Sequence, residues 1–204
     1  MLALARRVLA VPLAYRAFSA LVGGAAGRDV FVRDHVRARP GDRVLDVGCG
    51  PADIVGHLPD VDYTGFDMSA EYIATAKKSW GRRRARFYQK RVSEESLAEH
   101  SGFDVVLAIG LLHHLDDLEA AHLLELARAA LVPGGRLVTL DGVFTRSQSA
   151  AARYLISRDR GRYVRDERGY LALAERVFPR VIPTVRSDLM RIPYTHLILE
   201  CEKT

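Results

Sequence analysis

The stretch from Phe103 to Ile109, FDVVLAI, is an almost unbroken apolar run. A strand with one wet face alternates apolar and polar residues, whereas a strand buried on both faces of a parallel sheet is apolar throughout. This segment therefore predicts a central parallel strand, which needs helices on both faces of its sheet. Shorter runs of the same kind predict strands over residues 43–47, 63–66, 85–89 and 136–140.

Helical patterns separate these expected strands. Residues 52–58 are typical of a short helix, Ser69 is a suitable N-cap for the next one, and Asp116 with Glu119 forms a box-like start for a third. The third helix has a stripe of apolar positions that step by four, three and four residues, namely Ala120, Leu124, Ala127 and Leu131. Pro133-Gly134-Gly135 is expected to stop this helix.

The last part of the chain predicts one more helix and a pair of strands. Asp166 is the expected N-cap of the helix, and Pro179 is expected to end it. Extended segments follow at Val181–Ser187 and Tyr194–Cys201. Strands that alternate with helices and then give way to a strand pair predict a doubly wound α/β sheet with an antiparallel strand near its end.

Composition excludes several other classes of protein. With 49% hydrophobic and 27% charged residues among 204, the chain is neither fibrous nor disordered. No apolar run approaches the roughly 20 residues of a membrane span, so no membrane insertion is expected. Two cysteines, Cys49 and Cys201, do not make a disulfide framework, and a reducing compartment such as the cytoplasm is the default.

The first 39 residues are expected to stand apart from the main domain at residues 40–204. Arg6-Arg7 and the apolar stretch from Val8 to Tyr15 resemble the start of a signal peptide, but Pro12 interrupts that stretch. The alternative, which we favour, is a helical leader that packs on the domain or covers its active site as a lid.

The turn after the first expected strand carries the most specific pattern, VLDVGCGPADI at residues 44–54. Its glycines allow positive φ and let the backbone approach a ligand, which in open α/β sheets binds at the carboxyl ends of the strands. Asp67 ends the next strand, 21 residues after Asp46, and suits two ribose hydroxyls. A dinucleotide-binding turn is disfavoured because Asp53 occupies the place of its third glycine.

Four segments in order resemble the motifs of the class I S-adenosylmethionine-dependent methyltransferases. They are VLDVGCGPADI (44–54), TGFDMS (64–69), FDVVLAIGLLHHLDD (103–117) and LVPGGRLVTLD (131–141). The resemblance covers about half of the chain. It implies a mostly parallel, seven-stranded Rossmann-like sheet whose last strand is antiparallel, with S-adenosyl-L-methionine as the cofactor.

The resemblance also implies roles for the matching residues. Gly48, Cys49 and Gly50 would line the methionine part of the cofactor, and Asp46 would organise the turn. The other implied cofactor contacts are Asp67 at the ribose, Met68 at the adenine, and Gly110 and Leu111 near the sulfonium. The stretch after the third strand, FYQKRVSEE, departs from the family because no acid sits where an adenine contact is common.

Methyl transfer from a sulfonium is an in-line displacement, so a base is needed only where the acceptor must lose a proton. Candidates for a catalytic role are His113 and His114 after the fourth strand, and Tyr194 and His196 at the start of the last. Each is also open to the alternative that it is simply packed and hydrogen-bonded. Asp141 ends the fifth strand at the same edge and is assigned a structural or cofactor-orienting role.

The absence of several motifs from the sequence narrows the chemical class of the methyl acceptor. The sequence after the fourth strand has no Asn/Asp-Pro-Pro-Tyr/Phe tetrapeptide, no cysteine lies near strands four and five, and no carboxylates cluster for a metal. A small-molecule oxygen or nitrogen acceptor remains. The segment 142–166 is expected to insert over the acceptor, with residues that suit an anionic one: Tyr154, Arg158, Arg160, Arg162, Tyr163 and Arg165.

Two basic tracts leave alternatives open. Residues 77–91 hold eight Lys or Arg and no acid, and residues 142–169 hold seven Arg, within a net charge of +5. A solvated surface is one interpretation of the tracts, and a nucleic-acid footprint is the other. An RNA methyltransferase, and a cofactor-binding protein without methyl transfer, are therefore the alternatives to a small-molecule methyltransferase. Nothing in the sequence indicates the oligomeric state.

Overall fold

The computed structural model describes residues 24–159 and 161–204, the side chains of residues 98 and 99 aside. Its centre is a seven-stranded sheet in the order β3-β2-β1-β4-β5-β7-β6. The strands are β1 (Arg43–Val47), β2 (Asp62–Asp67), β3 (Ala85–Gln89), β4 (Phe103–Ile109), β5 (Leu131–Gly142), β6 (Arg180–Arg186) and β7 (His196–Glu202). Strand β7 runs antiparallel to both of its neighbours, and the other pairs are parallel. The predicted doubly wound sheet with an antiparallel last strand is confirmed.

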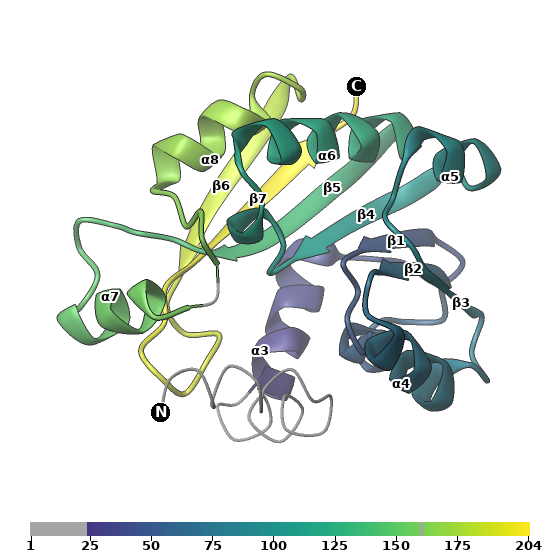
Figure 1. Ribbon diagram of the computed structural model, residues 1–204, viewed down its shortest axis with the longest axis horizontal. Coiled ribbons are helices and arrows are strands. Elements are labelled where there is room, and N and C mark those ends of the chain that lie inside the picture. The colour runs from purple at the N-terminus through teal and green to yellow at the C-terminus, as the bar shows by residue number, and fades with distance from the viewer. Residues whose placement is uncertain (1–23, 160) are drawn as a thin grey trace.

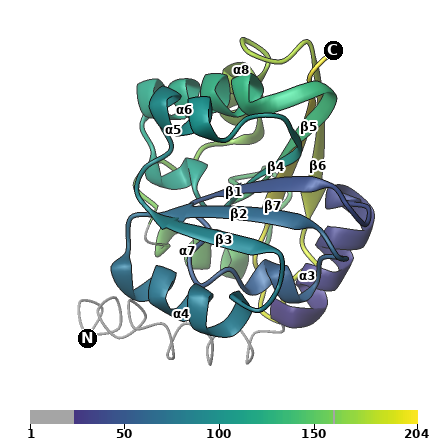
Figure 2. The same ribbon diagram turned by 90° about the vertical axis from the view of Figure 1, so that its right-hand side faces the viewer.

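Helices lie on both faces of this sheet (Figures 1 and 2). One face carries α5 (Glu94–Glu99), α6 (Asp117–Ala130) and α8 (Glu167–Ala174), and the other carries α3 (Gly24–Phe31) and α4 (Ala70–Trp80). Helix α7 (Ala150–Ser157) belongs to the segment between β5 and α8. Three short helical turns complete the described helices, namely the π-helical turn η1 (Val32–Val36) and the tighter 3₁₀ turns η2 (Asp53–Gly56) and η3 (Leu112–His114).

The buried apolar residues form two cores, one on each face of the sheet. Successive side chains of a strand point to opposite faces, so Leu45 of β1 joins the core under α6 and α8, whereas Val44 joins the core over α3. Strand β4 divides in the same way and is buried along almost its whole length. The apolar run that predicted a strand covered on both faces is therefore explained by two separate helical layers.

The starts of the helices follow the predicted signals. Ser69 accepts a hydrogen bond from the Tyr72 backbone N–H, and Asp166 accepts one from Gly169. Asp116 and Glu119 form a capping box at the start of α6. Each cap satisfies backbone donors that a helix leaves unpaired at its N-terminus.

Three predicted element boundaries need correction. Helix α8 ends at Ala174, before the Pro179 that was expected to end it. Helix α6 ends at Ala130, and β5 already begins at Leu131, so Pro133-Gly134-Gly135 lies inside an irregular strand. Proline disfavours helical backbone at the residue before it, and the chain is extended from Leu131 on. The helix expected over residues 52–58 is only the 3₁₀ turn η2, because Ala52 takes a left-handed conformation (φ 56°) that delays its start.

Residues 1–23 of the predicted leader lie outside the described residues. The rest of it, α3 and η1, packs into the core on its face of the sheet through Phe31, Val32 and Val36. His35 of η1 also contacts the buried Glu200 of β7 at 2.9 Å, and Arg37 forms an ion pair with the same carboxylate. None of the helices in the described part of the chain is long and apolar enough to cross a membrane.

Candidate active site at the carboxyl edge of the sheet

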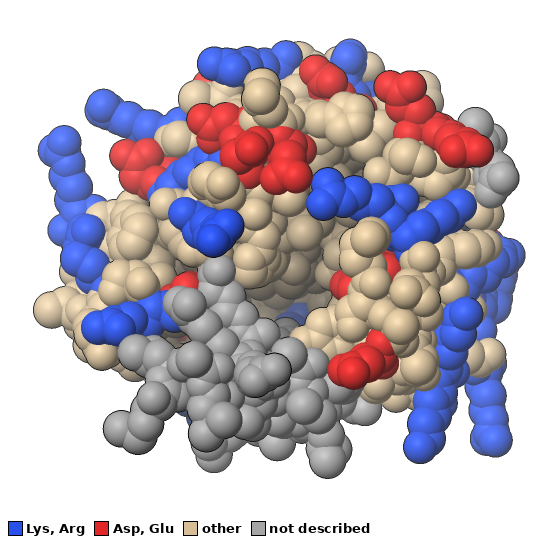
Figure 3. Space-filling view, viewed as in Figure 1, with Lys and Arg blue, Asp and Glu red and all other residues tan. Residues whose placement is uncertain are grey.

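The carboxyl ends of β1, β2, β4 and β5 meet at one edge of the sheet. Because β7 is antiparallel, its first residue, His196, pairs with Gly142 at the end of β5 and lies at the same edge. In Figure 3 the surface is hollowed near the place where Figure 1 shows β4 to end above α3. Ligands of open α/β sheets bind at such an edge.

The glycine turn after β1 occupies one half of this edge. Gly48 and Gly50 have positive φ angles of 73° and 53°, and the Gly48 N–H donates to the Phe66 carbonyl of β2 at 2.8 Å. A Cβ added to Gly50 would meet nothing within 4 Å, so open space lies in front of this backbone. The Cys49 side chain points away from that space and packs against Gly65, which leaves only its backbone to face a ligand.

Asp67 at the end of β2 holds the turn from the other side. Its carboxylate accepts hydrogen bonds from the Gly50 N–H at 2.9 Å and from the Ser69 N–H at 2.7 Å. A carboxylate has about four acceptor positions, so both oxygens retain capacity for hydroxyl donors. Met68 follows with 62% of its surface exposed, an apolar side chain available for a flat ring.

Asp46 lies beneath the turn in the core on the α3 face. It accepts a hydrogen bond from the Tyr63 hydroxyl at 2.6 Å, and its Oδ1 is buried with no hydrogen-bond partner. Burial, opposed by the Tyr63 hydrogen bond and reinforced by the charge of Asp67, raises the pKa of Asp46 to about 7. Its contact with Tyr63 agrees with the expected role of supporting the turn from below.

His113 and Asp141 form the centre of the other half of the edge. Asp141 Oδ1 accepts from the His113 backbone N–H at 3.2 Å and lies 2.7 Å from the ring Nδ1. Burial by itself lowers the pKa of His113, but the hydrogen bond and charge of Asp141, with the charge of Asp159, outweigh it and raise that pKa. The second oxygen of Asp141, Oδ2, is buried without a partner.

The segment between β5 and α8 brings Asp159 into this half. Its Oδ1 lies 3.7 Å from His113 Nε2, and its Oδ2 accepts the Tyr194 hydroxyl at 2.5 Å. Burial and the neighbouring Asp159 raise the pKa of Tyr194, which keeps the phenol protonated. Gly161 packs so closely on His113 that an added Cβ would overlap the imidazole ring.

The remaining two candidate histidines differ in burial. His196 is 5% exposed, its ring centre lies 4.7 Å from that of Tyr194, and its Nδ1 has no partner. Desolvation lowers the pKa of His196 to about 4, so the ring is neutral at neutral pH. His114 is exposed, and its ring centre lies 4.2 Å from that of His113. The structure thus gathers His113, Tyr194 and His196 in one cluster and leaves His114 at its surface.

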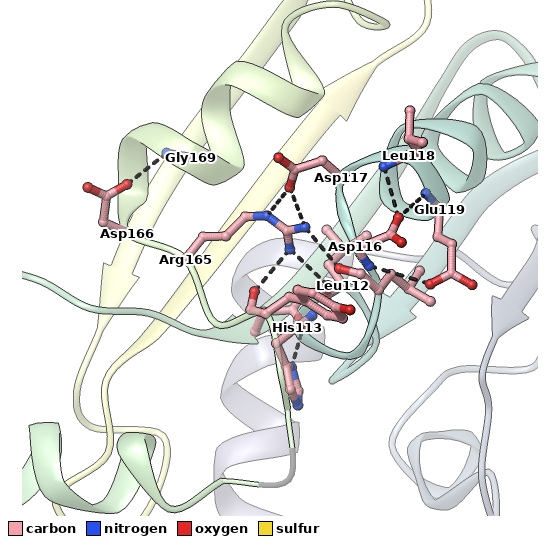
Figure 4. Close-up of polar contacts among 12 residues, drawn as sticks. Leu112, His113, Asp116, Asp117, Leu118, Glu119, Arg165, Asp166 and Gly169 are labelled. Carbon is pink, nitrogen blue, oxygen red and sulfur yellow. Dashed lines mark hydrogen bonds and ion pairs between the residues drawn. The ribbon is translucent and has the colours of Figure 1, made fainter.

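Arg165 stabilises the loop that carries His113 (Figure 4). Its guanidinium donates to the carbonyls of Leu112 and Leu115 at 3.1 and 2.9 Å, and to that of Tyr163 at 3.0 Å. It also donates twice to Asp117 Oδ1, at 3.0 and 2.7 Å, so all five N–H donors are engaged. Arg165 was expected to contribute to a cap over an anionic acceptor, and its donors are instead committed to this loop.

The other members of the expected anion-binding cap are placed as follows. Arg160 lies outside the described residues. Arg158 stacks over the exposed Tyr154 ring at 5.2 Å, and Arg162 and Tyr163 are exposed. The anion-binding cap over the acceptor therefore stays a prediction.

The basic tract at residues 77–91 lies over the end of α4 and the edge strand β3. Arg86 pairs with Asp62 at 3.1 Å, Arg91 with Glu119 at 3.4 Å, and Arg83 donates to the Val55 carbonyl at 3.2 Å. Lys77 and Lys78 point outward from α4 and are exposed. Charged side chains on an edge strand also oppose pairing with another sheet, which is a sufficient structural reason for part of this tract.

Known proteins resemble this chain over its cofactor-binding part. The sequence profile of a methyltransferase-domain family matches residues 45–137. The 27-O-demethylrifamycin SV methyltransferase of Amycolatopsis mediterranei is 34% identical over 116 residues, which are 50% of this chain and 39% of the relative. An O-methyltransferase of Pyrenophora dematioidea is 33% identical over 117 residues, 54% of this chain and 43% of the relative.

A solved structure of similar fold extends the match to nearly the whole chain. It is an N-methyltransferase of Haemonchus contortus in complex with phosphomonomethylethanolamine and S-adenosylhomocysteine, with a TM-score of 0.72 at 15% identity. The superposition covers 97% of this chain and 58% of that one. These comparisons support a class I S-adenosylmethionine-dependent methyltransferase domain over residues 45–137 of this chain. The chain spans about two fifths of the length of the two curated relatives, 39% and 43%.

The glycine turn of this chain fits S-adenosylmethionine, the cofactor of the methyltransferase domains that the chain resembles. The open space before Gly50 offers a cradle for the cofactor. Asp67 offers acceptors for the ribose hydroxyls, and the exposed Met68 offers an apolar surface for the adenine. Gly110, with φ 65°, follows β4 with only His113 near an added Cβ, at 3.7 Å. A side chain at Gly50 or Gly110 would fill this cradle, so the glycines at these two positions fit S-adenosylmethionine.

Sequence reasoning missed two members of the cluster. Asp141 was placed at the right edge but not paired with His113, and Asp159 was not assigned a role. Asp159 follows α7 in a segment without a motif, so no pattern in the sequence marks it. Gly161, two residues later, is the nearest local signal, since a glycine is required where His113 packs on the backbone.

Proposed function

We propose that this protein transfers a methyl group from S-adenosylmethionine to an oxygen or nitrogen atom of a small molecule. The observation that carries the proposal is the buried 2.7 Å contact between His113 and Asp141, next to the glycine-lined edge that fits the cofactor. A histidine held by a carboxylate is suited to accept a proton near neutral pH. When bound, S-adenosylmethionine supplies an activated methyl group.

In this proposal one half of the edge holds the cofactor. Asp67 accepts hydrogen bonds from the ribose, Met68 packs on the adenine, and Asp46 supports the turn from below. The backbone around the two open glycine positions admits the methionine part. The cofactor contacts are Gly48, Cys49 through its backbone, Gly50, Gly110 and Leu111.

The other half orients and deprotonates the acceptor. Asp141 holds the Nδ1–H of His113, which leaves Nε2 as the nitrogen that takes a proton from the acceptor. His196, with its pKa lowered to about 4, is a much weaker base, and we assign it a packing role under Tyr194. Tyr194 orients Asp159 through its hydroxyl. We assign His114 no role in proton transfer or acceptor binding, because it is exposed at the surface of the cluster.

A small molecule is favoured as the acceptor for two reasons. Both curated relatives named above are methyltransferases, and the name of one specifies a small molecule, 27-O-demethylrifamycin SV. The segment 142–166 also brings Asp159 and Gly161 over His113, which narrows the approach. The leader at residues 1–39 is proposed to complete this cover as a lid. The free, buried thiols of Cys49 and Cys201 suit a reducing compartment, so we extend the proposal to the cytoplasm.

Methyl-label transfer tests this function. The purified protein is incubated with methyl-labelled S-adenosylmethionine and either a small-metabolite extract or total RNA, in parallel with His113→Gln and with His114→Gln as the matched control. We expect label in the small-molecule fraction with the wild type and His114→Gln, and strong loss with His113→Gln. Label found in RNA would favour the basic tracts as the acceptor surface. Cofactor binding without label transfer would favour a binding protein.

A further inference from the structure

Helix α3 of the leader lies against the segment that follows the glycine turn. Nη2 of its Arg28 is 3.8 Å from Oδ2 of Asp53, the first residue of η2, and its Asp29 pairs with His57 at 2.6 Å. In Figure 3 a small area of basic side chain is visible at the bottom of the hollow, where Figure 1 shows α3, and Arg28 is the one Lys or Arg of that helix. The leader therefore places a positive charge beside the cofactor half of the edge.

The N–H groups of the glycine turn are already used. Gly48 and Cys49 both donate to the Phe66 carbonyl, at 2.8 and 3.0 Å, and Gly50 donates to Asp67 at 2.9 Å. The proline that follows has no N–H, and the alanine after it donates to the Cys49 carbonyl at 2.9 Å. Backbone turns bind anions through N–H groups that point at the ligand. This turn therefore needs a donor from another element to hold an anionic group.

The acids around the turn create the same need for a positive charge. Asp46 lies beneath the turn, Asp67 beside it, and Asp53 shortly after it. The methionine part of S-adenosylmethionine carries one ammonium and one carboxylate group. The acids suit the ammonium, whereas a carboxylate next to them would meet like charge unless a cation accompanies it. A guanidinium meets this need, since its planar fork can hold a carboxylate through two parallel N–H donors.

We propose that Arg28 binds the carboxylate of the methionine part of the cofactor, so that α3 of the leader completes the cofactor half. This inference rests on the proposed function, which supplies the cofactor. A guanidinium has five N–H donors, so Arg28 can serve Asp53 and a ligand carboxylate together. The contact with Asp53 orients the guanidinium toward the end of the turn. The leader then has a task in cofactor binding that is separate from its proposed task as a lid over the acceptor.

Two ligands that differ in one group test the inference. Decarboxylated S-adenosylhomocysteine keeps the ammonium of S-adenosylhomocysteine and lacks only the carboxylate. Calorimetric titration of the full chain measures the affinity for each. We expect the wild type to bind S-adenosylhomocysteine at least about tenfold more tightly, which corresponds to 1.4 kcal/mol, and Arg28→Gln to bind the two about equally. Arg33→Gln, which removes an exposed arginine of the same leader, is the matched control and should keep the wild-type ratio.

The ratio of the two affinities separates carboxylate binding from general damage to the turn, because such damage weakens both ligands alike. An Arg28→Gln variant that keeps the wild-type ratio would overturn the inference, and so would equal binding of the two ligands by the wild type. If Arg28→Gln does not fold, Arg28→Lys replaces it. Lysine lacks the planar fork, so we expect the ratio to narrow by about threefold or more, and an unchanged ratio would again overturn the inference.

Failure of the inference can be told from failure of the proposed function. No binding of S-adenosylhomocysteine to the wild type would count against the proposed function. Binding of S-adenosylhomocysteine with no preference over the decarboxylated ligand would count against the role of Arg28 alone.

Discussion

The two halves of the carboxyl edge are built in different ways. The cofactor half consists mainly of backbone from one short turn, with Asp67 from the neighbouring strand, and apart from Gly110, Leu111 and the inferred contact of Arg28 it comes from residues 46–68. The acceptor half consists of side chains from four separate segments, namely η3, the end of β5, the loop after α7 and the residues just before and at the start of β7. A short turn can carry its function in a local motif, whereas a cluster of distant side chains exists only once the sheet is assembled. Each prediction below changes one half and tests whether the other responds.

The largest effect is expected from His113→Gln. Loss of a general base lowers turnover by roughly 10²–10⁴-fold. Affinity for S-adenosylhomocysteine should stay at the wild-type value, because His113 lies in the acceptor half. Turnover with labelled cofactor and calorimetric titration measure the two quantities, and His114→Gln is the control. Equal loss of cofactor affinity would mean that the two halves are not separable.

Arg165→Ala is expected to destabilise the fold by about 2–4 kcal/mol, because it leaves the Leu112 and Leu115 carbonyls without their charged donor. Arg162→Ala, at an exposed position in the same segment, should change stability by less than about 0.5 kcal/mol. Urea unfolding compares the two variants with the wild type. A similarly small loss of stability in both variants would show that the Arg165 contacts do not hold the loop that carries His113.

A pH effect is expected from the burial of His196. Its pKa in the folded protein is about 4, below the ordinary value of 6.5, so the unfolded chain binds a proton that the folded chain does not. This contribution to stability is present above pH 6.5 and is lost as pH falls toward 4. Between pH 7 and pH 4.5, the free energy of unfolding should therefore fall by about 1–3 kcal/mol less in His196→Gln than in the wild type. His122 is exposed, so the free energy of unfolding of His122→Gln should depend on pH as it does in the wild type. The same pH dependence in His196→Gln and His122→Gln would argue against a neutral, buried His196.

The smallest effect is expected from a pair of glycine substitutions. Gly50 and Gly41 both have positive φ, 53° and 90°, and an added Cβ meets nothing within 4 Å at either. Gly50→Ala and Gly41→Ala should each cost about 1 kcal/mol of stability through backbone strain. Only Gly50→Ala should also weaken S-adenosylhomocysteine binding, by about tenfold, which corresponds to 1.4 kcal/mol. Equal affinity of both variants for S-adenosylhomocysteine would show that the turn is not part of the cofactor site.

The sequence predicted the fold well where local signals decide it. The strand over Phe103–Ile109 and the capping box at Asp116 are confirmed because a continuous apolar run and a helix cap both depend on near neighbours in the sequence. The early end of α6 was missed because the pairing of Leu131 with Phe103 across the sheet draws the chain into a strand before Pro133. Tertiary pairing overrode the local helical pattern there.

The candidate site divides in the same way. The turn at Gly48 and the acid at Asp67 were predicted, since a motif and a strand end mark them. The partnership of His113 with Asp141 required two strands to be placed side by side. The role of Asp159 could not be predicted from the sequence, because its contact with His113 depends on how a segment without a motif folds back over η3.

The central claim is that one edge of the sheet holds a cofactor half and an acceptor half that act separately. Calorimetric titration with S-adenosylhomocysteine tests it most directly, on the wild type, Asp67→Ala and His113→Gln. We predict micromolar binding to the wild type, the same affinity for His113→Gln, and loss of binding for Asp67→Ala. No binding to the wild type, or the same affinity for Asp67→Ala as for the wild type, would contradict the account.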